Sequence, residues 1–161
     1  MRLQDELGLR APFQDLRHEA VLNIVRTGTV LSGRASQMFR GFGLTEAQFN
    51  VLFALKFASD RITQAELGKR LVVTRASITS VLDKLESKGW VQRIDVPENR
   101  RIHHVILTDS GRALVNEVEP AYRREVHKVL SDLDDEQCRA LMSMLETVRG
   151  RVRTSGASGG E

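Results

Sequence analysis

Cysteine and proline are scarce in this 161-residue chain. The single cysteine, Cys138, has no partner for an internal disulfide, and a cysteine-based metal cluster is disfavoured because it needs several thiolates. Such a composition is typical of a reducing compartment. Only three prolines occur, and apolar residues recur at helical spacing over most of the chain. The sequence therefore predicts a mainly helical protein that is long enough to bury a sizeable core.

Long apolar runs are absent as well. No stretch approaches the roughly 20 apolar residues that a membrane helix needs. The first ten residues, MRLQDELGLR, lack the apolar centre of a secretory signal. We therefore expect a soluble, cytoplasmic protein with no membrane partner.

Motifs of catalysis and metal binding are also missing from the sequence. It contains no glycine-rich phosphate loop, nucleophile elbow or metal-hydrolase motif, so it predicts neither an enzyme nor a cofactor. His103 and His104 are adjacent in an expected strand and point to opposite faces, so they cannot share one metal ion. His18 and His127 are isolated in the sequence. No metal site is predicted.

Positive charge is concentrated in the middle of the chain. The formal net charge is only +3, but residues 61–104 carry nine Lys and Arg against five Asp and Glu. A basic patch of this kind indicates a polyanionic partner, although many solvated surfaces reach the same excess.

The helices are predicted from caps and apolar spacing. A first helix is expected over about residues 13–40, with an apolar surface wide enough for burial on more than one side. Capping boxes at Thr45 and Thr63, each followed three residues later by Gln or Glu, begin two further helices. The next helix follows Thr74, a good N-cap residue, and ends before Gly89. It presents one apolar face, made of Ile78, Val81, Leu82 and Leu85.

A β-hairpin is predicted after this helix. Residues 90–94 and 102–107 read as strands, and the segment between them contains turn residues, which places Arg100 and Arg101 at the hairpin tip. A long helix is expected from Thr108 to about residue 130, and Pro120 should kink or interrupt it. Asp134 caps a last helix, and residues 154–161 are expected to form a flexible tail.

This order of elements is that of a winged helix-turn-helix, so the fold class predicted is mainly α with a small β-hairpin wing. In such a motif the second helix enters the DNA major groove and its first residues meet base edges. Arginines of a wing can enter the adjacent minor groove, and helix N-termini offer N–H groups to phosphates. The predicted DNA-contacting residues are Thr63, Gln64, Thr74, Arg75, Ser77, Thr79, Ser80, Lys84, Asn99, Arg100 and Arg101.

Each half of this prediction has a plainer alternative. The helix alone would also suit an ordinary solvated surface, and Asp83 on its outward side would repel phosphates unless it accepts from a cation or from cytosine. Arg100 and Arg101 would also keep an exposed hairpin soluble. The two features together favour DNA binding.

From Leu44 to Leu114 the sequence resembles the MarR family of transcriptional regulators (multiple antibiotic resistance regulators). The resemblance rests on LTEAQFNVLFAL, TQAELGKRL, SITSVLDKLESKGWVQR and NRRIHHVILTDSGRAL, in that order. It implies an N-terminal dimerisation helix over 1–43, a DNA-binding domain over 44–114 and C-terminal dimerisation helices over 115–153. Where the family has an Asp-x-Arg wing motif, this chain has Asn99 and Arg101, and Asn gives the guanidinium no charge-assisted hydrogen bond.

The resemblance also implies a function. It indicates a homodimer that binds double-stranded DNA at a pseudo-palindromic operator, a repressor released by a small effector that is often an aromatic acid. Arg17, His18 and Arg26 on the first helix are candidates to meet such an acid, with interface ion pairs as the alternative. Two further alternatives stay open, a redox-sensing regulator that uses Cys138 and a winged helix that binds protein.

Overall fold

The computed structural model describes residues 2–58, 61–71, 78–96 and 99–157, and of 96, 99–102 and 153–157 only the backbone. The chain divides into two compact units, Met1–Pro120 and Ala121–Glu161. Helix α6, Asp109–Val129, belongs to both units. Among the residues described, no helix combines the length and the apolarity needed to cross a membrane.

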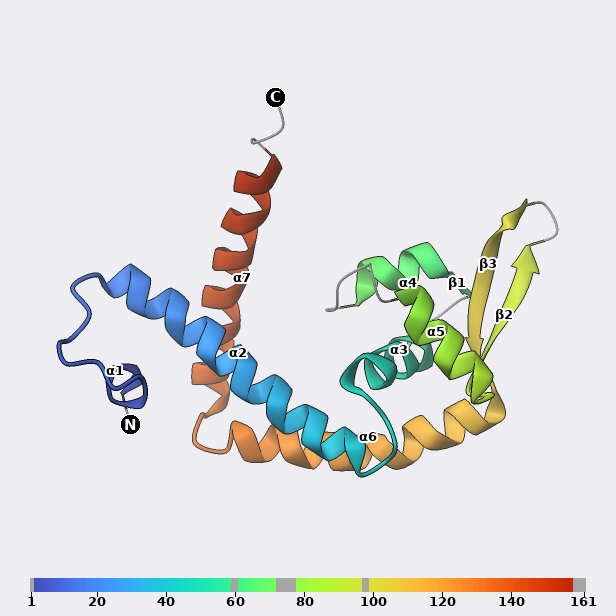
Figure 1. Cartoon of the computed structure of the whole chain (residues 1–161), viewed down its shortest axis with the longest axis horizontal. Coiled ribbons are helices and arrows are strands. Elements are labelled where there is room, and N and C mark those ends of the chain that lie inside the picture. The colour runs from blue at the N-terminus through green and yellow to red at the C-terminus, as the bar shows by residue number, and fades with distance from the viewer. Residues whose placement is uncertain (1, 59–60, 72–77, 97–98, 158–161) are drawn as a thin grey trace. The chain divides into compact units, whose positions relative to one another are not determined.

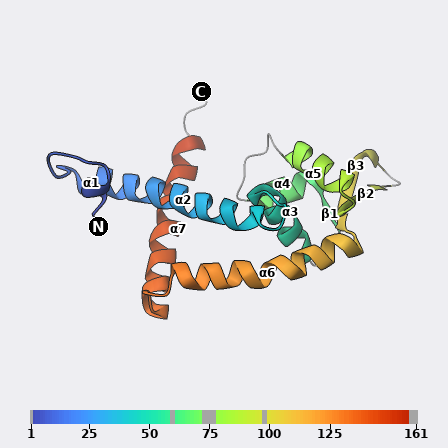
Figure 2. The same ribbon diagram turned by 60° about the horizontal axis from the view of Figure 1, so that its bottom comes forward.

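The first unit contains the predicted winged helix-turn-helix (Figure 1). Its strands form one antiparallel sheet in the order β1-β3-β2. Helix α3 contacts α4, α5 and β3, and α5 contacts β2, so the helices gather beside the sheet in both views (Figures 1 and 2). The elements are α3 (Glu46–Lys56), β1 (Ile62–Thr63), α4 (Gln64–Arg70), α5 (Ile78–Ser87), β2 (Val91–Val96) and β3 (Asn99–Leu107).

Local sequence signals account for the ends of these helices. Thr45 and Gln48 form a reciprocal capping box at α3, and Thr63 and Glu66 form another at α4, as predicted. After α5 the chain turns at Gly89, whose φ of +69° suits glycine. The Trp90 N–H then reaches the Leu85 carbonyl and the Gly89 N–H reaches the Glu86 carbonyl, which is a Schellman motif.

The core of the first unit lies between the helices and the sheet. Helix α2, Leu16–Arg40, joins it through Phe39, whose ring stacks on Phe49 of α3 with centroids 4.3 Å apart. Helix α6 joins it through Val115 and Val118. The most deeply buried side chains are Phe39, Phe49, Val51, Leu52, Leu67, Leu82, Leu85, Val105, Val115 and Val118.

The hairpin differs from the prediction at its tip. Val96 pairs with Asn99, and a register irregularity lies between Asp95 and Val96. The ladder therefore continues almost to the end of the hairpin, and Arg100 and Arg101 belong to strand β3 rather than to the connecting loop. The two-residue strand β1, which pairs Ile62 with Val105, was not predicted because it is too short to show alternation.

The N-terminal segment also differs from the prediction. Helix α2 begins at Leu16, where the Asp15 side chain accepts from the Arg17 N–H, rather than near residue 13. A short helix α1, Leu3–Glu6, precedes it and buries Leu3. Glu6 accepts from Arg26 of α2 at 2.5 Å, so an ion pair connects the two helices.

Helix α6 continues through Pro120, where a kink or an interruption was predicted, and α7 extends farther than predicted. Pro120 lies inside α6 without interrupting it. Helix α7, Asp135–Ala157, begins at the predicted cap, where the Asp134 side chain accepts from the Gln137 N–H at 2.8 Å. It continues through 154–157, into the first residues of the predicted flexible tail.

Candidate nucleic-acid interface

Helix α5 presents three different faces. Its buried face packs Ile78, Leu82 and Leu85 on the core, as the sequence predicted. The exposed face is formed by Ser80, Lys84 and Ser87, which are spaced by four and three residues and therefore lie in one stripe. Between the two faces lies a flank formed by Thr79, Asp83 and Glu86 at the same spacing. We call these the exposed stripe and the flank of α5.

The flank of α5 is held to neighbouring elements at both ends. At the start of the helix, the Gln64 amide of α4 donates to the Thr79 hydroxyl at 2.8 Å. This hydrogen bond connects a side chain of α4 directly to a side chain of α5, the two helices of the helix-turn-helix. Gln64 and Thr79 were both predicted to contact DNA, and the structure brings them together.

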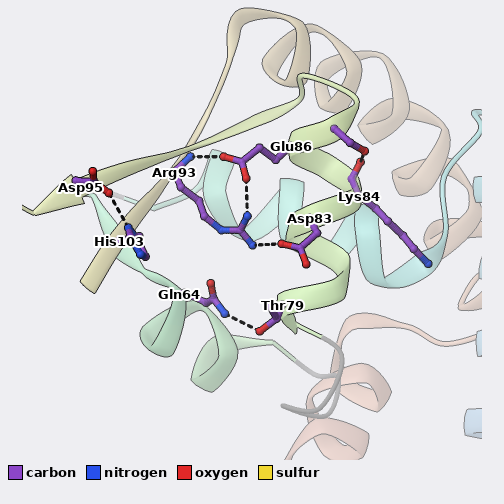
Figure 3. A network of polar contacts seen from close by, with 9 residues as sticks. Gln64, Thr79, Asp83, Lys84, Glu86, Arg93, Asp95 and His103 are labelled. Carbon is purple, nitrogen blue, oxygen red and sulfur yellow. Dashed lines mark hydrogen bonds and ion pairs between the residues drawn. The ribbon is translucent and has the colours of Figure 1, made fainter. Parts of the chain in front are cut away.

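Arg93 of β2 holds the other end of the flank (Figure 3). Its Nη2 lies 2.6 Å from Oδ1 of Asp83, and its Nη1 lies 2.5 Å from Oε2 of Glu86. The Arg93 backbone N–H donates to the other Glu86 oxygen at 3.0 Å. One residue of the wing therefore contacts two successive turns of α5.

Burial and pairing act in opposite directions on the Arg93 guanidinium. Its side chain is only 20% exposed, and burial disfavours its charge. The hydrogen bonds to Asp83 and Glu86, and the charges of both carboxylates, outweigh burial and raise the pKa of Arg93 above its ordinary value. The guanidinium stays charged throughout the range in which proteins are folded.

The wing becomes more exposed toward its tip. Val91 and Val105, near the base of the hairpin, are buried. Arg93 pairs with Val105 across the ladder and is half-buried. Farther along the same face, the Nδ1 atom of His103 lies 2.9 Å from Oδ1 of Asp95 (Figure 3). This face of the hairpin therefore changes from apolar to charged as it leaves the core.

Some of the predicted DNA-contacting residues are described with their side chains, some by their backbone only, and some lie outside the described residues. Ser80 and Lys84 lie on the exposed stripe, as a DNA-facing position requires. The Thr63 hydroxyl accepts from the Glu66 N–H and donates to its carboxylate, so the cap of α4 already engages it. Asn99, Arg100 and Arg101 lie in β3, and only their backbone is described. Thr74, Arg75 and Ser77 lie outside the described residues.

Sequence reasoning missed the role of Arg93. The available signal was a basic residue in the first predicted strand, seven and ten positions after two acidic residues spaced three apart on the preceding helix. Asp83 was expected to repel phosphates unless it accepted from a cation or from cytosine, and the structure shows it accepting a hydrogen bond from the cation Arg93. Its 59% exposed side chain is therefore paired within the protein.

The other candidate groups have ordinary structural surroundings. Arg26 is paired with Glu6, and the His18 ring meets Phe13 edge-on with centroids 5.8 Å apart. Cys138 is half-buried near the start of α7, where its N–H donates to the Asp134 carbonyl. Within the described part of the chain, no group of three or more His, Cys, Asp or Glu side chains is placed to hold a metal ion.

Comparison with known proteins agrees with this architecture. A family model described as MarR family matches residues 42–102. The HTH-type transcriptional regulator MhqR of Bacillus subtilis is 32% identical over 106 residues, which cover 66% of this chain and 72% of MhqR. The chain belongs to the MarR family. The transcriptional repressor YetL of the same organism is 35% identical over 108 residues, 66% of this chain and 65% of YetL, so the chain spans just under two thirds of that relative.

A solved structure of a MarR-family protein matches most of the chain. Mutant MarR from Escherichia coli, complexed with operator DNA, is 29% identical and gives a TM-score of 0.67. The match covers 84% of this chain and 99% of the MarR chain. The match therefore extends beyond the residues 42–102 that the family model covers.

Proposed function

We propose that this MarR-family protein is a sequence-specific regulator of transcription that binds double-stranded DNA as a homodimer. The observation that carries the proposal is the geometry of α5, whose exposed stripe bears Lys84 while its flank is fixed to α4 and to the wing. A helix held in this way suits the major groove, which admits one α-helix. The structure of the E. coli relative with operator DNA supports the same use of the fold.

The contacts with DNA belong to two groups in this proposal. Base edges are read by Thr74, Arg75 and Ser77 and, on α5, by Thr79 and Ser80, while Gln64 supports Thr79. Phosphates are bound by Lys84 and by the N-terminus of α4 at Thr63. Asn99, Arg100 and Arg101 of the wing meet the adjacent minor groove, where arginine senses the negative potential.

Dimerisation is supported by apolar surface that the single chain leaves exposed. On α7 the residues Cys138, Leu141, Leu145, Val148 and Val152 are spaced alternately by three and four, which is the spacing of a helical seam. On α2 the exposed apolar residues include Leu16, Val25 and Val30. Patches of this kind mark protein interfaces. A symmetric dimer would place two recognition helices about 34 Å apart, one turn of DNA.

Repression, release by a small effector and a cytoplasmic location complete the proposal. YetL is named a repressor, whereas MhqR is named only a regulator, so repression is the finer part of the claim. The division into 1–43, 44–114, 115–153 and 154–161 as functional segments likewise remains a proposal. The family consists of transcription regulators, and we propose no enzymatic activity.

The first test is selection of a binding site from a random duplex pool, followed by titration over a range of salt. We expect one pseudo-palindromic site whose affinity falls steeply with salt, because each neutralised phosphate contributes about 0.9 to the slope of log K against log salt. Arg101→Ala should weaken this site roughly tenfold. Arg112→Ala removes an exposed arginine at the start of α6 and should leave affinity close to wild type.

Selection also distinguishes the alternatives. Enrichment without a palindrome would contradict the symmetric dimer. Binding that is never enriched and hardly depends on salt would overturn the proposed function in favour of a protein-binding winged helix.

A further inference from the structure

Arg93 lies at the level of the sheet where β3 pairs with both β1 and β2. It pairs with Val105 of β3, which pairs in turn with Ile62 of β1, so this row crosses all three strands of the sheet. Residues directly opposite in an antiparallel ladder project to the same face. The Arg93 side chain therefore leaves the sheet beside the buried Val105 and Ile62, on the face that carries α5 (Figure 3).

The contact between Arg93 and α5 has a geometry that only arginine provides. The two terminal nitrogens reach different carboxylates, Asp83 and Glu86, and the backbone N–H of the same residue holds Glu86 a second time. A guanidinium is a rigid planar fork, so its two bonds fix the orientation of what they hold. A lysine ammonium would supply the charge as a single point on a flexible stem.

The orientation of the Asp83 and Glu86 carboxylates matters because the flank that carries them adjoins the exposed stripe. Asp83 precedes Lys84 in sequence, so a carboxylate of the flank lies directly beside the exposed stripe. A free carboxylate at that position would meet DNA phosphates with like charge. In the structure both carboxylates turn toward Arg93 (Figure 3), while the exposed stripe consists of two serines and a lysine.

We infer that Arg93 is a positioning residue for DNA recognition, which sets the angle of α5 against the wing and keeps Asp83 and Glu86 away from the DNA backbone. The inference rests on the proposed function. It assigns operator selectivity to a residue that itself contacts neither base nor phosphate. The major groove and the adjacent minor groove are engaged together only if α5 and the hairpin keep a fixed relation. The fork of Arg93 supplies the side-chain part of that relation.

The test compares Arg93→Lys with the matched control Arg112→Lys, and both substitutions keep the formal charge. Dissociation constants are measured for the selected site and for a scrambled duplex at one salt concentration, well below the unfolding temperature of each variant. We expect the ratio of non-specific to specific Kd to fall roughly tenfold or more for Arg93→Lys, because a displaced helix loses at least one base contact. Non-specific binding should change less than about twofold, because it follows charge.

A second variant keeps the inference testable if Arg93→Lys folds poorly. Glu86→Gln leaves Arg93 in place and removes the charge of one of its acceptors, so it should lower the same ratio by a smaller factor. Arg112→Lys should keep the wild-type ratio.

The possible outcomes separate failure of the positioning role from failure of the proposed function. A wild-type ratio in folded Arg93→Lys would overturn the positioning role while leaving the proposed function intact. An equal loss of specific and non-specific binding would also overturn it, because that result indicates a role in stability alone. If the wild-type protein selects no site, the proposed function fails and the positioning role fails with it.

Discussion

At the scale of single residues, Gly111 packs directly against the backbone of Trp90. A Cβ atom at this position would lie 1.9 Å from the Trp90 carbonyl oxygen and 2.8 Å from its carbon. Thr108 brings the two segments together, since its hydroxyl donates to the Gly89 carbonyl and accepts from the Gly111 N–H. Ser110 donates to the same Gly89 carbonyl at 2.7 Å. Thr-Asp-Ser-Gly thus both begins α6 and fastens it to the turn after α5.

Gly111→Ala should therefore be among the most damaging small substitutions in the chain. We expect it to lower the free energy of unfolding by about 3 kcal/mol, because backbone atoms must move to admit a methyl group. Gly89→Ala is the matched comparison, since nothing lies within 4 Å of its added Cβ and only its φ of +69° opposes the change. It should cost about 1 kcal/mol. Urea denaturation of the three proteins measures both values, and equal costs would contradict the steric argument.

The sequence predicted part of the candidate interface but missed the pairing of Arg93 with α5. Ser80 and Lys84 were placed correctly on an exposed face because helical spacing fixes which residues lie together. Arg93 was missed because its partners, Asp83 and Glu86, become neighbours only after the hairpin folds against α5. Pairing of that kind depends on sheet register and on packing, which spacing within one segment does not encode.

At the scale of secondary-structure elements, helix α4 starts with a cap that depends on charge. The Glu66 carboxylate accepts from the Thr63 backbone N–H and from its hydroxyl, each at 2.8 Å. The backbone hydrogen bond is the largest cause that lowers the pKa of Glu66 below its ordinary value of 4.5, followed by the hydroxyl bond. A carboxyl whose folded pKa is depressed contributes stability above its unfolded pKa. That contribution is lost as pH falls through the folded pKa.

Glu66→Gln should consequently show a stability difference that depends on pH. Glutamine can still close a capping box, so the variant removes the charge and keeps the cap. We expect wild type to be the more stable protein at about pH 6.5, and the gap to shrink as pH falls below the ordinary glutamate pKa. Urea midpoints at about pH 6.5 and about pH 3.5 measure it, with Glu117→Gln as a control at an exposed glutamate of α6. A gap that stays constant between the two pH values would contradict the charge-dependent cap.

The elements were predictable where their signals are local. Both capping boxes, the apolar face of α5 and the Asp134 cap need only residues within one or two turns of each other. Strand β1 and the outer part of β3 were not predictable in this way, because a two-residue strand exists only through its partner Val105. Arg100 and Arg101 also fall in β3, opposite the register irregularity between Asp95 and Val96, which no local pattern in the sequence marks.

At the scale of the whole molecule, the surface of α7 indicates which state binds DNA. The seam Cys138, Leu141, Leu145, Val148 and Val152 lies on one side of the helix, and Val148 is 42% exposed in the single chain. Ser143 lies on the opposite side at the helical spacing of 100° per residue, and it is also exposed. A second copy of the chain would cover the seam and leave Ser143 in water.

Val148→Glu and Ser143→Glu introduce the same charge on these opposite sides of α7. Comparing them should separate dimerisation from DNA binding by a single chain. We expect sedimentation equilibrium to give twice the chain mass of 18.1 kDa for wild type and Ser143→Glu, and the single chain mass for Val148→Glu. A monomer loses the effective concentration that one half-site contact lends the other, so its operator affinity should fall by about a hundredfold or more. Its affinity for a single half-site should stay near that of wild type, because α5, Arg93 and the wing lie in the other unit. A Val148→Glu protein that remains dimeric would instead assign the interface to the exposed apolar residues of α2.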